Sequence, residues 1–220
     1  MLLTACVSAP RATLLEFSEY DHGAAPEITR MWVTDSYLRI DGGQGEDGFI
    51  LLDRATRTIY SVAHADKSVL VIASRKIDLT PPKRFEHTVD RDHGIYPAVA
   101  GRTVRRYVLY TNRQRCQEVF AADGLLPEAL TALRDYQEVL AGEQAFTAAR
   151  RPKEFQTDCA LADDVFVPAR QLAFGFPVKR IDSTGRARDL TDYRTGVDVE
   201  PGLFQLPAGY RHYSLHEHLR

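Results

Sequence analysis

The sequence predicts an α+β protein in which an antiparallel sheet packs on helices. Strand-like segments follow one another at hairpin spacing through the first half of the chain, between residues 14 and 73. A clear helical pattern begins at residue 127, and strand patterns return after residue 170. Runs of strands followed by helices indicate the α+β class rather than alternating α/β units.

The composition is typical of a soluble globular protein, with 220 residues of which 44% are hydrophobic and 26% charged. A formal net charge of -2 gives no overall attraction to nucleic acid, so we expect no nucleic-acid partner. No apolar run approaches the roughly 20 residues that a membrane-spanning helix needs. No shift in composition marks a boundary, so residues 11–220 are expected to form a single domain.

The predicted strands of the first half are separated by short polar connections, as expected for antiparallel neighbours. Residues 49–52 and 69–72 are apolar on both faces rather than alternating, so both sides of these strands must be covered. We expect a helix on one side, and a loop, a partner or a ligand on the other. The strands predicted here are residues 14–20, 28–34, 37–41, 49–52, 58–62 and 69–73.

The clearest helix is predicted between Pro127, which suits the first helical position, and Gly142, which suits the position just past the end. Its apolar face is formed by four leucines, and we expect two of them, Leu130 and Leu133, to face the sheet. The other two are Leu126 and Leu140.

The rest of the second half is expected to be irregular first and strand-rich last. Residues 76–101 contain many prolines and glycines, which predicts irregular structure. A second helical stretch, residues 143–162, is expected to kink or restart at Pro152. The remaining predicted strands are a hairpin over residues 104–121 and the closing segments 171–174, 178–182 and 187–193.

The amino terminus carries Leu3-Thr4-Ala5-Cys6, which is typical of a lipobox, the signal at which bacteria cleave a precursor and attach lipid to the cysteine. Acyl chains bound to Cys6 would anchor the protein, since each buried CH₂ contributes about 0.8 kcal/mol. Few apolar residues precede the motif, whereas a secretory signal needs roughly 7–15 of them. Residues 1–10 are therefore interpreted as a truncated signal, a lipobox and a tether. The alternative is a chance match in a cytoplasmic amino terminus.

The three cysteines are consistent with an exported protein. Lipidation of Cys6 leaves Cys116 and Cys159, and two thiols can pair in an oxidising periplasm. In the chain-entropy model a bridge over a loop of this length stabilises the fold by about 4 kcal/mol. We predict the disulfide, and the alternative is two unrelated buried thiols.

Several short motifs resemble those of the LolA/LolB/LppX-like superfamily of periplasmic lipoproteins, in particular its members of the domain-of-unknown-function kind. They are Tyr37–Asp41, Ile50–Asp53, Thr58–Tyr60, Gly175–Val178, and Phe204–Tyr210 with its F-x-x-P-x-G-Y pattern. The resemblance implies a half-barrel, a curved antiparallel sheet wrapped around helices, with an apolar cavity between them that shelters acyl chains. An anchored Cys6 implies a receptor or fixed component of the LolB type rather than a soluble carrier.

Other polar patterns leave alternatives open. His212, His216 and His218 permit a metal site or a solvated tail, and Asp92-His93 is interpreted as a surface pair. The arginines between residues 102 and 115 suit either an anionic partner or a charge-balanced hairpin face. No common catalytic or nucleotide-binding motif occurs, so the sequence predicts no enzyme, no cofactor and no metal.

The function predicted from these observations is that of a non-catalytic envelope lipoprotein, facing the periplasm and anchored to the outer membrane through Cys6. It binds an apolar ligand, a lipid or a lipoprotein acyl chain, in the half-barrel cavity. Leu130 and Leu133 are the candidate cavity residues. The alternative is a structural or assembly lipoprotein that acts through protein contacts and has no ligand cavity.

Overall fold

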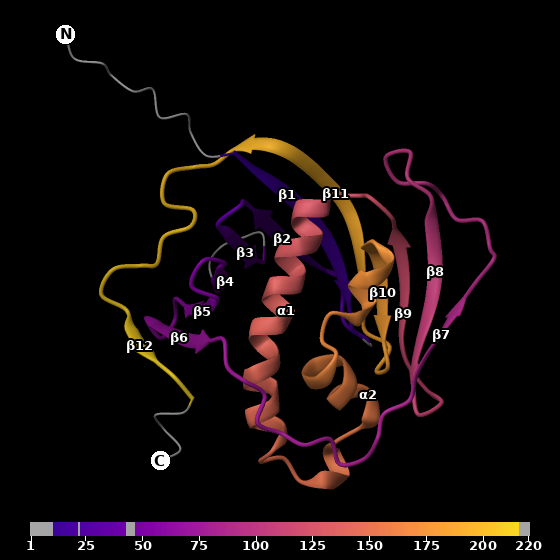
Figure 1. Cartoon of the computed structure of the whole chain (residues 1–220). Coiled ribbons are helices and arrows are strands. Elements are labelled where there is room, and N and C mark those ends of the chain that lie inside the picture. The colour runs from indigo at the N-terminus through magenta and orange to yellow at the C-terminus, as the bar shows by residue number, and fades with distance from the viewer. Residues whose placement is uncertain (1–10, 22, 43–46, 216–220) are drawn as a thin grey trace.

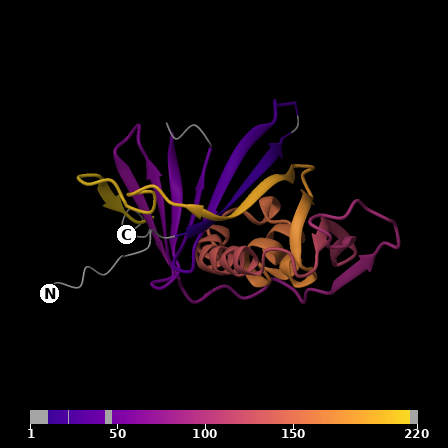
Figure 2. The same ribbon diagram turned by 90° about the horizontal axis from the view of Figure 1, so that it is seen from above.

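The computed structural model describes residues 11–21, 23–42 and 47–215 of the chain (Figure 1). It is a mostly-β protein, because the described part forms one twelve-stranded sheet with a single long helix and a few shorter helical segments. The sheet is neither closed nor strongly curled. The helical layer covers one face of the sheet, between strands β2–β6 on one side and β8–β10 on the other (Figure 2). Cys6 lies outside the described residues, so the lipid anchor stays a prediction.

The sheet runs in the order β12-β6-β5-β4-β3-β2-β1-β11-β10-β9-β8-β7, and all neighbouring strands are antiparallel except β12 and β6. The predicted strands of the first half are all present as a meander from β1 to β6. The strands are β1 Arg11–Tyr20, β2 Glu27–Val33, β3 Tyr37–Asp41, β4 Gly48–Asp53, β5 Thr58–Ala63, β6 Ser68–Ala73, β7 His87–Arg91, β8 Val104–Thr111, β9 Gln114–Ala122, β10 Phe176–Asp182, β11 Ala187–Asp198 and β12 Arg211–Tyr213.

The pairing of β1 with β11 joins the first strand to a strand from the last part of the chain, in the middle of the sheet. Leu15 lies opposite Tyr193, and the pairing shifts register between Ala12 and Leu14 and between Glu16 and Phe17. Such bulges bend a strand and increase its twist. The first strand is thus held between β2, its neighbour in sequence, and β11 from the far end of the chain.

The helical layer begins as predicted and ends later than predicted. Helix α1, Pro127–Ala148, starts at the expected proline. The prediction that it stops before Gly142 is wrong, because Gly142 is buried inside the helix. A Cβ at this position would lie 2.9 Å from the carbonyl oxygen of Arg75, so the glycine allows α1 to approach the chain after β6. A glycine is therefore needed at this position for close packing, and not to end the helix.

The segment after α1 is broken into short pieces. The predicted interruption at Pro152 is confirmed, since a 3₁₀ turn follows it directly. The pieces are the 3₁₀ turn Lys153–Phe155, helix α2 Asp158–Ala160, a π-helical segment Leu161–Phe166 and a 3₁₀ helix Arg170–Phe174. The strand predicted at residues 171–174 is therefore wrong, and the segment 76–101 predicted as irregular contains the edge strand β7.

The main core lies between α1 and the sheet. Ala132 and Val139 of α1 are fully buried against strands of the meander, where Leu15, Met31 and Leu38 are also fully buried. Leu130 and Leu133 belong to this packing, Leu133 as a buried member and Leu130 as a partly buried neighbour. Burial of this apolar face is the main stabilising contribution to the contact between the two layers.

The opposite face of the meander is covered by the segment that leads to β12. Phe49 and Val69 form a second core there, against Phe204 and Tyr210. The ring of Phe204 stacks on Tyr37 at 5.4 Å between centroids. The strands that are apolar on both faces are therefore covered by α1 on one side and, of the three options, by a loop on the other.

A disulfide between Cys116 and Cys159 joins β9 to α2, as predicted. Both cysteines are buried. Within the described residues, no helix is long and apolar enough to cross a membrane.

Candidate functional site

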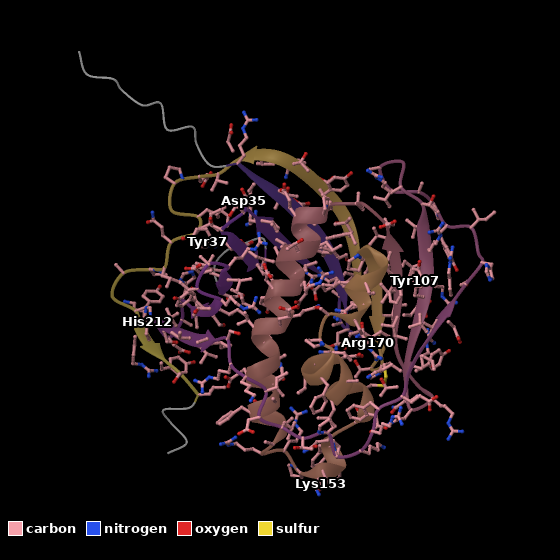
Figure 3. All side chains as sticks on the ribbon, viewed as in Figure 1. Asp35, Tyr37, Tyr107, Lys153, Arg170 and His212 are labelled. Atoms are coloured by element: carbon pink, nitrogen blue, oxygen red, sulfur yellow. A yellow bond between two sulfur atoms is a disulfide. The ribbon has the colours of Figure 1, made fainter. Side chains whose placement is uncertain are left out.

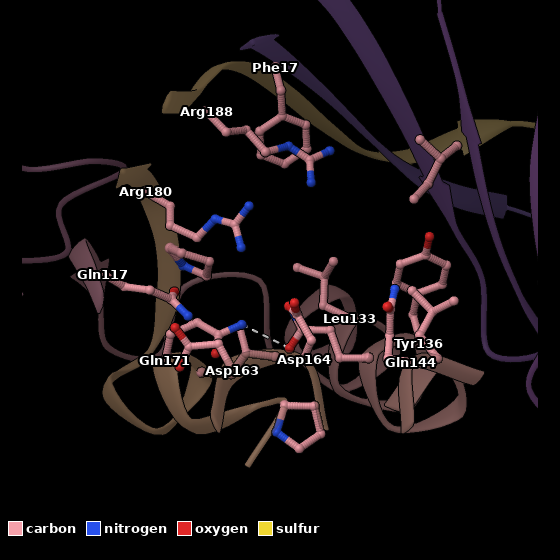
Figure 4. A pocket seen from close by; sticks show the side chains of 16 residues that line it. Phe17, Gln117, Leu133, Tyr136, Gln144, Asp163, Asp164, Gln171, Arg180 and Arg188 are labelled. Carbon is pink, nitrogen blue, oxygen red and sulfur yellow. Dashed lines mark hydrogen bonds between the residues drawn. The ribbon is translucent and has the colours of Figure 1, made fainter. Parts of the chain in front are cut away.

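A cavity of about 230 Å³ lies between α1 and the sheet. The π-helical segment and the 3₁₀ helix Arg170–Phe174 form its floor, and strands β1, β3, β9, β10 and β11 supply the remaining walls (Figure 4). Protein interiors are packed as densely as organic crystals, so a space of this size is not an ordinary packing defect. We take it as the candidate site.

One wall of the cavity is apolar. Leu133 and Leu140 of α1 lie two helical turns apart and therefore on the same face of the helix. Phe17 of β1 and Ile40 of β3 face them from the sheet. The structure thus places Leu133, one of the two predicted cavity residues, in the wall. The other, Leu130, packs against the main core and is not part of the lining.

Two arginines from neighbouring strands form a cationic wall. The guanidinium of Arg188 on β11 lies over the Phe17 ring, with Cζ 3.9 Å from the ring centroid, and its Nε is 3.4 Å from Glu19 Oε1. Burial lowers the pKa of Arg188, but an arginine stays charged at neutral pH. Arg180 on β10 makes no ion pair with any of the described residues. Both guanidinium groups project toward the cavity (Figure 4).

The π-helical segment brings two consecutive acidic residues to the floor. The Val167 amide donates to the Ala162 carbonyl at 2.8 Å, the wider hydrogen bond that defines this kind of turn. Single π turns are frequent at functional sites. Asp163 accepts a hydrogen bond from Arg170 Nε at 2.6 Å, and burial raises the pKa of Asp163 against the effect of this arginine.

Asp164 lines the same cavity and is exposed to solvent. Burial raises the pKa of its carboxyl, and the nearby charge of Asp163 raises it further, while Arg180 opposes the shift. Arg170, which holds Asp163, lies between the helical layer and strand β8 (Figure 3). Arg170 also donates to the Tyr110 carbonyl at 3.1 Å, so the arginine that holds Asp163 is itself held by β8.

Two deeply buried amides complete the polar lining. Gln117 on β9 is 4% exposed and Gln171 is 2% exposed. The Gln171 amide donates to Gln137 Oε1 at 2.9 Å (Figure 4), but the side-chain oxygens of Gln117 and Gln171 have no partner among the protein atoms. A buried acceptor without a partner costs about 1–3 kcal/mol, so a donor inside the cavity would be stabilised there.

A second, open cleft of about 1390 Å³ lies at the other end of α1. It is formed by the start of β1 and α1 and by the chain after β11, including Leu126 and Phe204. Leu15 and Ala132 are fully buried and lie between the cleft and the cavity on β1 and α1. The seam between helix and sheet is therefore filled in the middle and open at both ends.

Two arginines of the β8–β9 hairpin, Arg106 and Arg115, form ion pairs with nearby acids. Arg106 lies 3.0 Å from Asp92 and 2.5 Å from Glu118, which also pairs with Arg115. Asp92 accepts a hydrogen bond from the Tyr96 hydroxyl at 2.7 Å. These contacts favour the charge-balanced alternative for Arg106 and Arg115, and the choice stays open for the other arginines of the run.

In the described part of the chain, no group of three or more histidine, cysteine, aspartate or glutamate side chains lies close enough together to hold a metal ion. His212 lies on β12, and its predicted companions His216 and His218 fall outside the described residues.

No protein-family model matches the chain, and no curated protein matches its sequence. Three solved structures have a similar fold. An uncharacterized conserved protein from Thermus thermophilus is 8% identical, with 92% of this chain and 90% of that chain covered and a TM-score of 0.48. Two crystal forms of PNGF-II are 9% and 8% identical, with TM-scores of 0.44 and 0.46 over 93% and 94% of this chain. The match spans 31% and 32% of PNGF-II, about a third of its length.

Sequence reasoning missed the polar lining of the cavity, because its members come from separate segments. The available signal was weak: Asp163 and Asp164 interrupt the otherwise apolar run 159–167, and Arg180 and Arg188 each occur within a strand. Only the packing of β9, β10 and β11 beneath the helical layer brings them together.

Proposed function

We propose that this protein is a non-catalytic lipoprotein of the bacterial envelope, anchored through Cys6 to the outer membrane and facing the periplasm. It binds an apolar ligand, the acyl chain of a lipid or lipoprotein, in the cavity beneath α1. In this proposal the sheet and the helical layer form a shallow half-barrel around the acyl chain of the ligand. The observation that supports it most directly is the cavity wall of Phe17, Ile40, Leu133 and Leu140.

The size of the cavity limits the ligand. Pockets for small molecules usually measure about 300–1000 Å³, and this one is about 230 Å³. One acyl chain, or part of it, suits this space better than several chains at once. The polar lining at the same site suits a chain that ends in a polar group.

The envelope location is supported by two independent observations. Disulfides form and persist in oxidising compartments, and Cys116–Cys159 is such a bridge. The motif Leu3-Thr4-Ala5-Cys6 supports a lipid anchor, as does the resemblance to LolA/LolB/LppX-like lipoproteins. Both observations support the compartment. The proposal of an apolar ligand depends on the cavity alone.

A structural or assembly role is the second candidate, and one observation favours it. The middle of the seam is filled by Leu15, Met31 and Ala132, so most of the space beneath α1 is packed with side chains. A protein of this kind would use its surface rather than its interior. The two candidates differ in whether a fatty-acid probe binds beneath α1.

The test is binding of the fluorescent fatty acid cis-parinaric acid to the purified protein, followed by native mass spectrometry. Leu140→Trp places a large ring in the cavity wall and should abolish binding. Thr131→Trp, an exposed position on the same helix, is the matched control and should leave binding unchanged. If the wild-type protein binds no probe, or if both variants bind as well as wild type, the ligand-binding proposal is wrong.

The anchor is tested separately in bacteria that express the protein from a full precursor. Cys6→Ser should abolish metabolic labelling with lipid and release the protein from membranes. A serine variant that stays labelled and membrane-bound would contradict the assignment of Cys6.

A further inference from the structure

A row of four charged side chains crosses the sheet at the cavity. Arg180 on β10 pairs in register with Arg188 on β11, Arg188 with Glu19 on β1, and Glu19 with Glu27 on β2. Two positive groups are therefore followed by two negative groups on four adjacent strands. Phe17, two residues before Glu19, lies under the Arg188 guanidinium and lines the cavity, so the row runs along its edge.

The two outer members of the row are not neutralised within the sheet. Like charges directly opposite each other on neighbouring strands are destabilising, and both Arg180–Arg188 and Glu19–Glu27 are such pairs. The ion pair between Arg188 and Glu19 joins only the inner members, with 3.4 Å between Nε and Oε1. Arg180 and Glu27 have no ion pair among the described residues. An anion at the arginines and a cation at the glutamates would relieve both contacts.

The row connects the cavity to an acidic recess. Arg180 and Arg188 line the cavity and also line a second, open space of about 390 Å³. Four carboxylates line this acidic recess, Glu19, Asp21, Glu27 and Asp182. Arg186 lies there too and pairs with Asp182 at 3.0 Å, so Glu19 and Glu27 are the carboxylates that the row itself contributes. The two arginines are thus common to the cavity, which also contains the apolar wall and the acids Asp163 and Asp164, and to the recess with its carboxylates.

We propose that the site selects a zwitterionic amphiphile of the phosphoethanolamine type. Its acyl chain lies against Leu133 and Leu140, its phosphate meets Arg180 and Arg188, and its ammonium group lies in the acidic recess at Glu19 and Glu27. Arginine is well suited to phosphate because its guanidinium donates two parallel hydrogen bonds. This inference rests on the proposed function, since it presumes that a lipid chain enters the cavity.

The buried amides fit the part of such a ligand that joins chain and headgroup. The side-chain oxygens of Gln117 and Gln171 accept hydrogen bonds and have no protein partner, and both residues are at least nine-tenths buried. A glycerol hydroxyl of a single-chain phospholipid donates to such oxygens. A plain fatty acid offers no donor there when it is ionised.

The experiment compares monomyristoyl phospholipids that share one acyl chain and differ in their headgroup: ethanolamine, choline and glycerol. Their dissociation constants are measured by displacement of cis-parinaric acid at neutral pH. The ethanolamine lipid should bind about fivefold more tightly than the other two, the effect expected of an ion pair near the surface. Choline carries the charge without N–H donors, and the glycerol headgroup lacks the cation.

Two charge-neutralising variants separate the contributions. Arg180→Gln should weaken all three phospholipids by about tenfold, as for loss of one charge-assisted hydrogen bond. Glu27→Gln should lower the affinity of the ethanolamine lipid to that of the glycerol lipid and leave the glycerol lipid unchanged. Glu27→Gln removes a like-charge contact, so thermal melting should show no loss of stability. Arg180→Gln also removes a favourable charge interaction with Asp163 and Asp164, so its affinities are measured well below its own melting temperature. Arg84→Gln, at an exposed arginine, is the control and should change nothing.

The outcomes distinguish failure of this headgroup inference from failure of the proposed lipid binding on which it rests. If cis-parinaric acid and all three lipids fail to bind, the proposed function is wrong and the inference falls with it. If the three lipids bind equally, or Glu27→Gln leaves the preference intact, lipid binding stands and the headgroup inference is overturned. Tighter binding of the glycerol lipid would identify an anion site without a cation site, which also overturns it.

Discussion

Replacement of Leu133 by alanine tests whether the space beneath α1 is a ligand cavity. A buried leucine cut back to alanine costs about 2–5 kcal/mol, and the upper part of that range comes from the void that is left. Leu133 is 7% exposed and borders a cavity of about 230 Å³, so its side chain lacks packing partners on one side. We expect Leu133→Ala to cost about 2 kcal/mol, near the lower end.

Leu52 provides the matched control. It is 0% exposed, belongs to the same core and is not part of the cavity lining. Leu52→Ala removes the same atoms from a fully packed site and should cost about 4 kcal/mol, because a new void forms. The same atoms are removed in both variants. The difference between their losses of unfolding free energy therefore reports the open space beside Leu133.

The assay is urea unfolding with and without saturating cis-parinaric acid. A ligand that binds only the folded state adds about 2.7 kcal/mol at a hundred times its dissociation constant. The wild-type protein and Leu52→Ala should both show this stabilisation, and Leu133→Ala should show clearly less of it. Equal losses of about 4 kcal/mol in both variants, with no stabilisation by the probe in any protein, would refute the reasoning and leave the structural role.

Three further predictions concern other parts of the fold. Replacing both Cys116 and Cys159 by serine removes a bridge between residues 43 positions apart, and denaturant unfolding should show a loss of about 4 kcal/mol. Gly142→Ala should destabilise the protein by about 1 kcal/mol, although alanine normally stabilises a helix, because the new Cβ would lie 2.9 Å from the Arg75 carbonyl oxygen. Asp164→Asn should make the protein more stable at neutral pH, by less than about 1 kcal/mol because the residue is partly exposed. The folded-state pKa of Asp164 is raised above its ordinary 3.8, so the wild type loses stability as pH rises through that window and the variant does not.

Each of these predictions has a contradicting result. A serine pair as stable as wild type would show that the bridge does not constrain the unfolded chain, and a stabilised Gly142→Ala would show that Arg75 yields easily. For Asp164 the measurement is the difference between the variant and wild-type stability curves against pH. The difference curve removes the opposite slopes of carboxyls with lowered pKa values, namely Asp92, Asp158 and Asp182. A flat difference curve would contradict the predicted shift.

Local patterns in the sequence predicted most of the elements. Short apolar or alternating segments, separated by short polar connections, were enough for the meander β1–β6, because antiparallel neighbours need only a few residues between them. Pro127 marked the start of α1, and the count of cysteines predicted the bridge between Cys116 and Cys159. The strand patterns and Pro127 depend only on residues close in sequence, and the disulfide follows from the number of cysteines.

The errors occurred where a residue serves a distant contact. Gly142 has the local signature of a helix end, yet it lies inside α1 because Arg75 approaches it from another segment. All five residues of strand β7 are exposed and they form no apolar pattern, so its pairing with β8 defines it. The apolar segment 171–174 lacks a strand neighbour and forms a 3₁₀ helix.

The sequence by itself determined which segments are strands, where the main helix starts and that two cysteines can pair. The tertiary structure alone decided which strands are neighbours, and with that the chemistry of the cavity. A period of two residues records which face of a strand is buried, but it does not record which strand lies beside it. The row of Arg180, Arg188, Glu19 and Glu27 exists only because β11, near the end of the chain, pairs with β1 at its start.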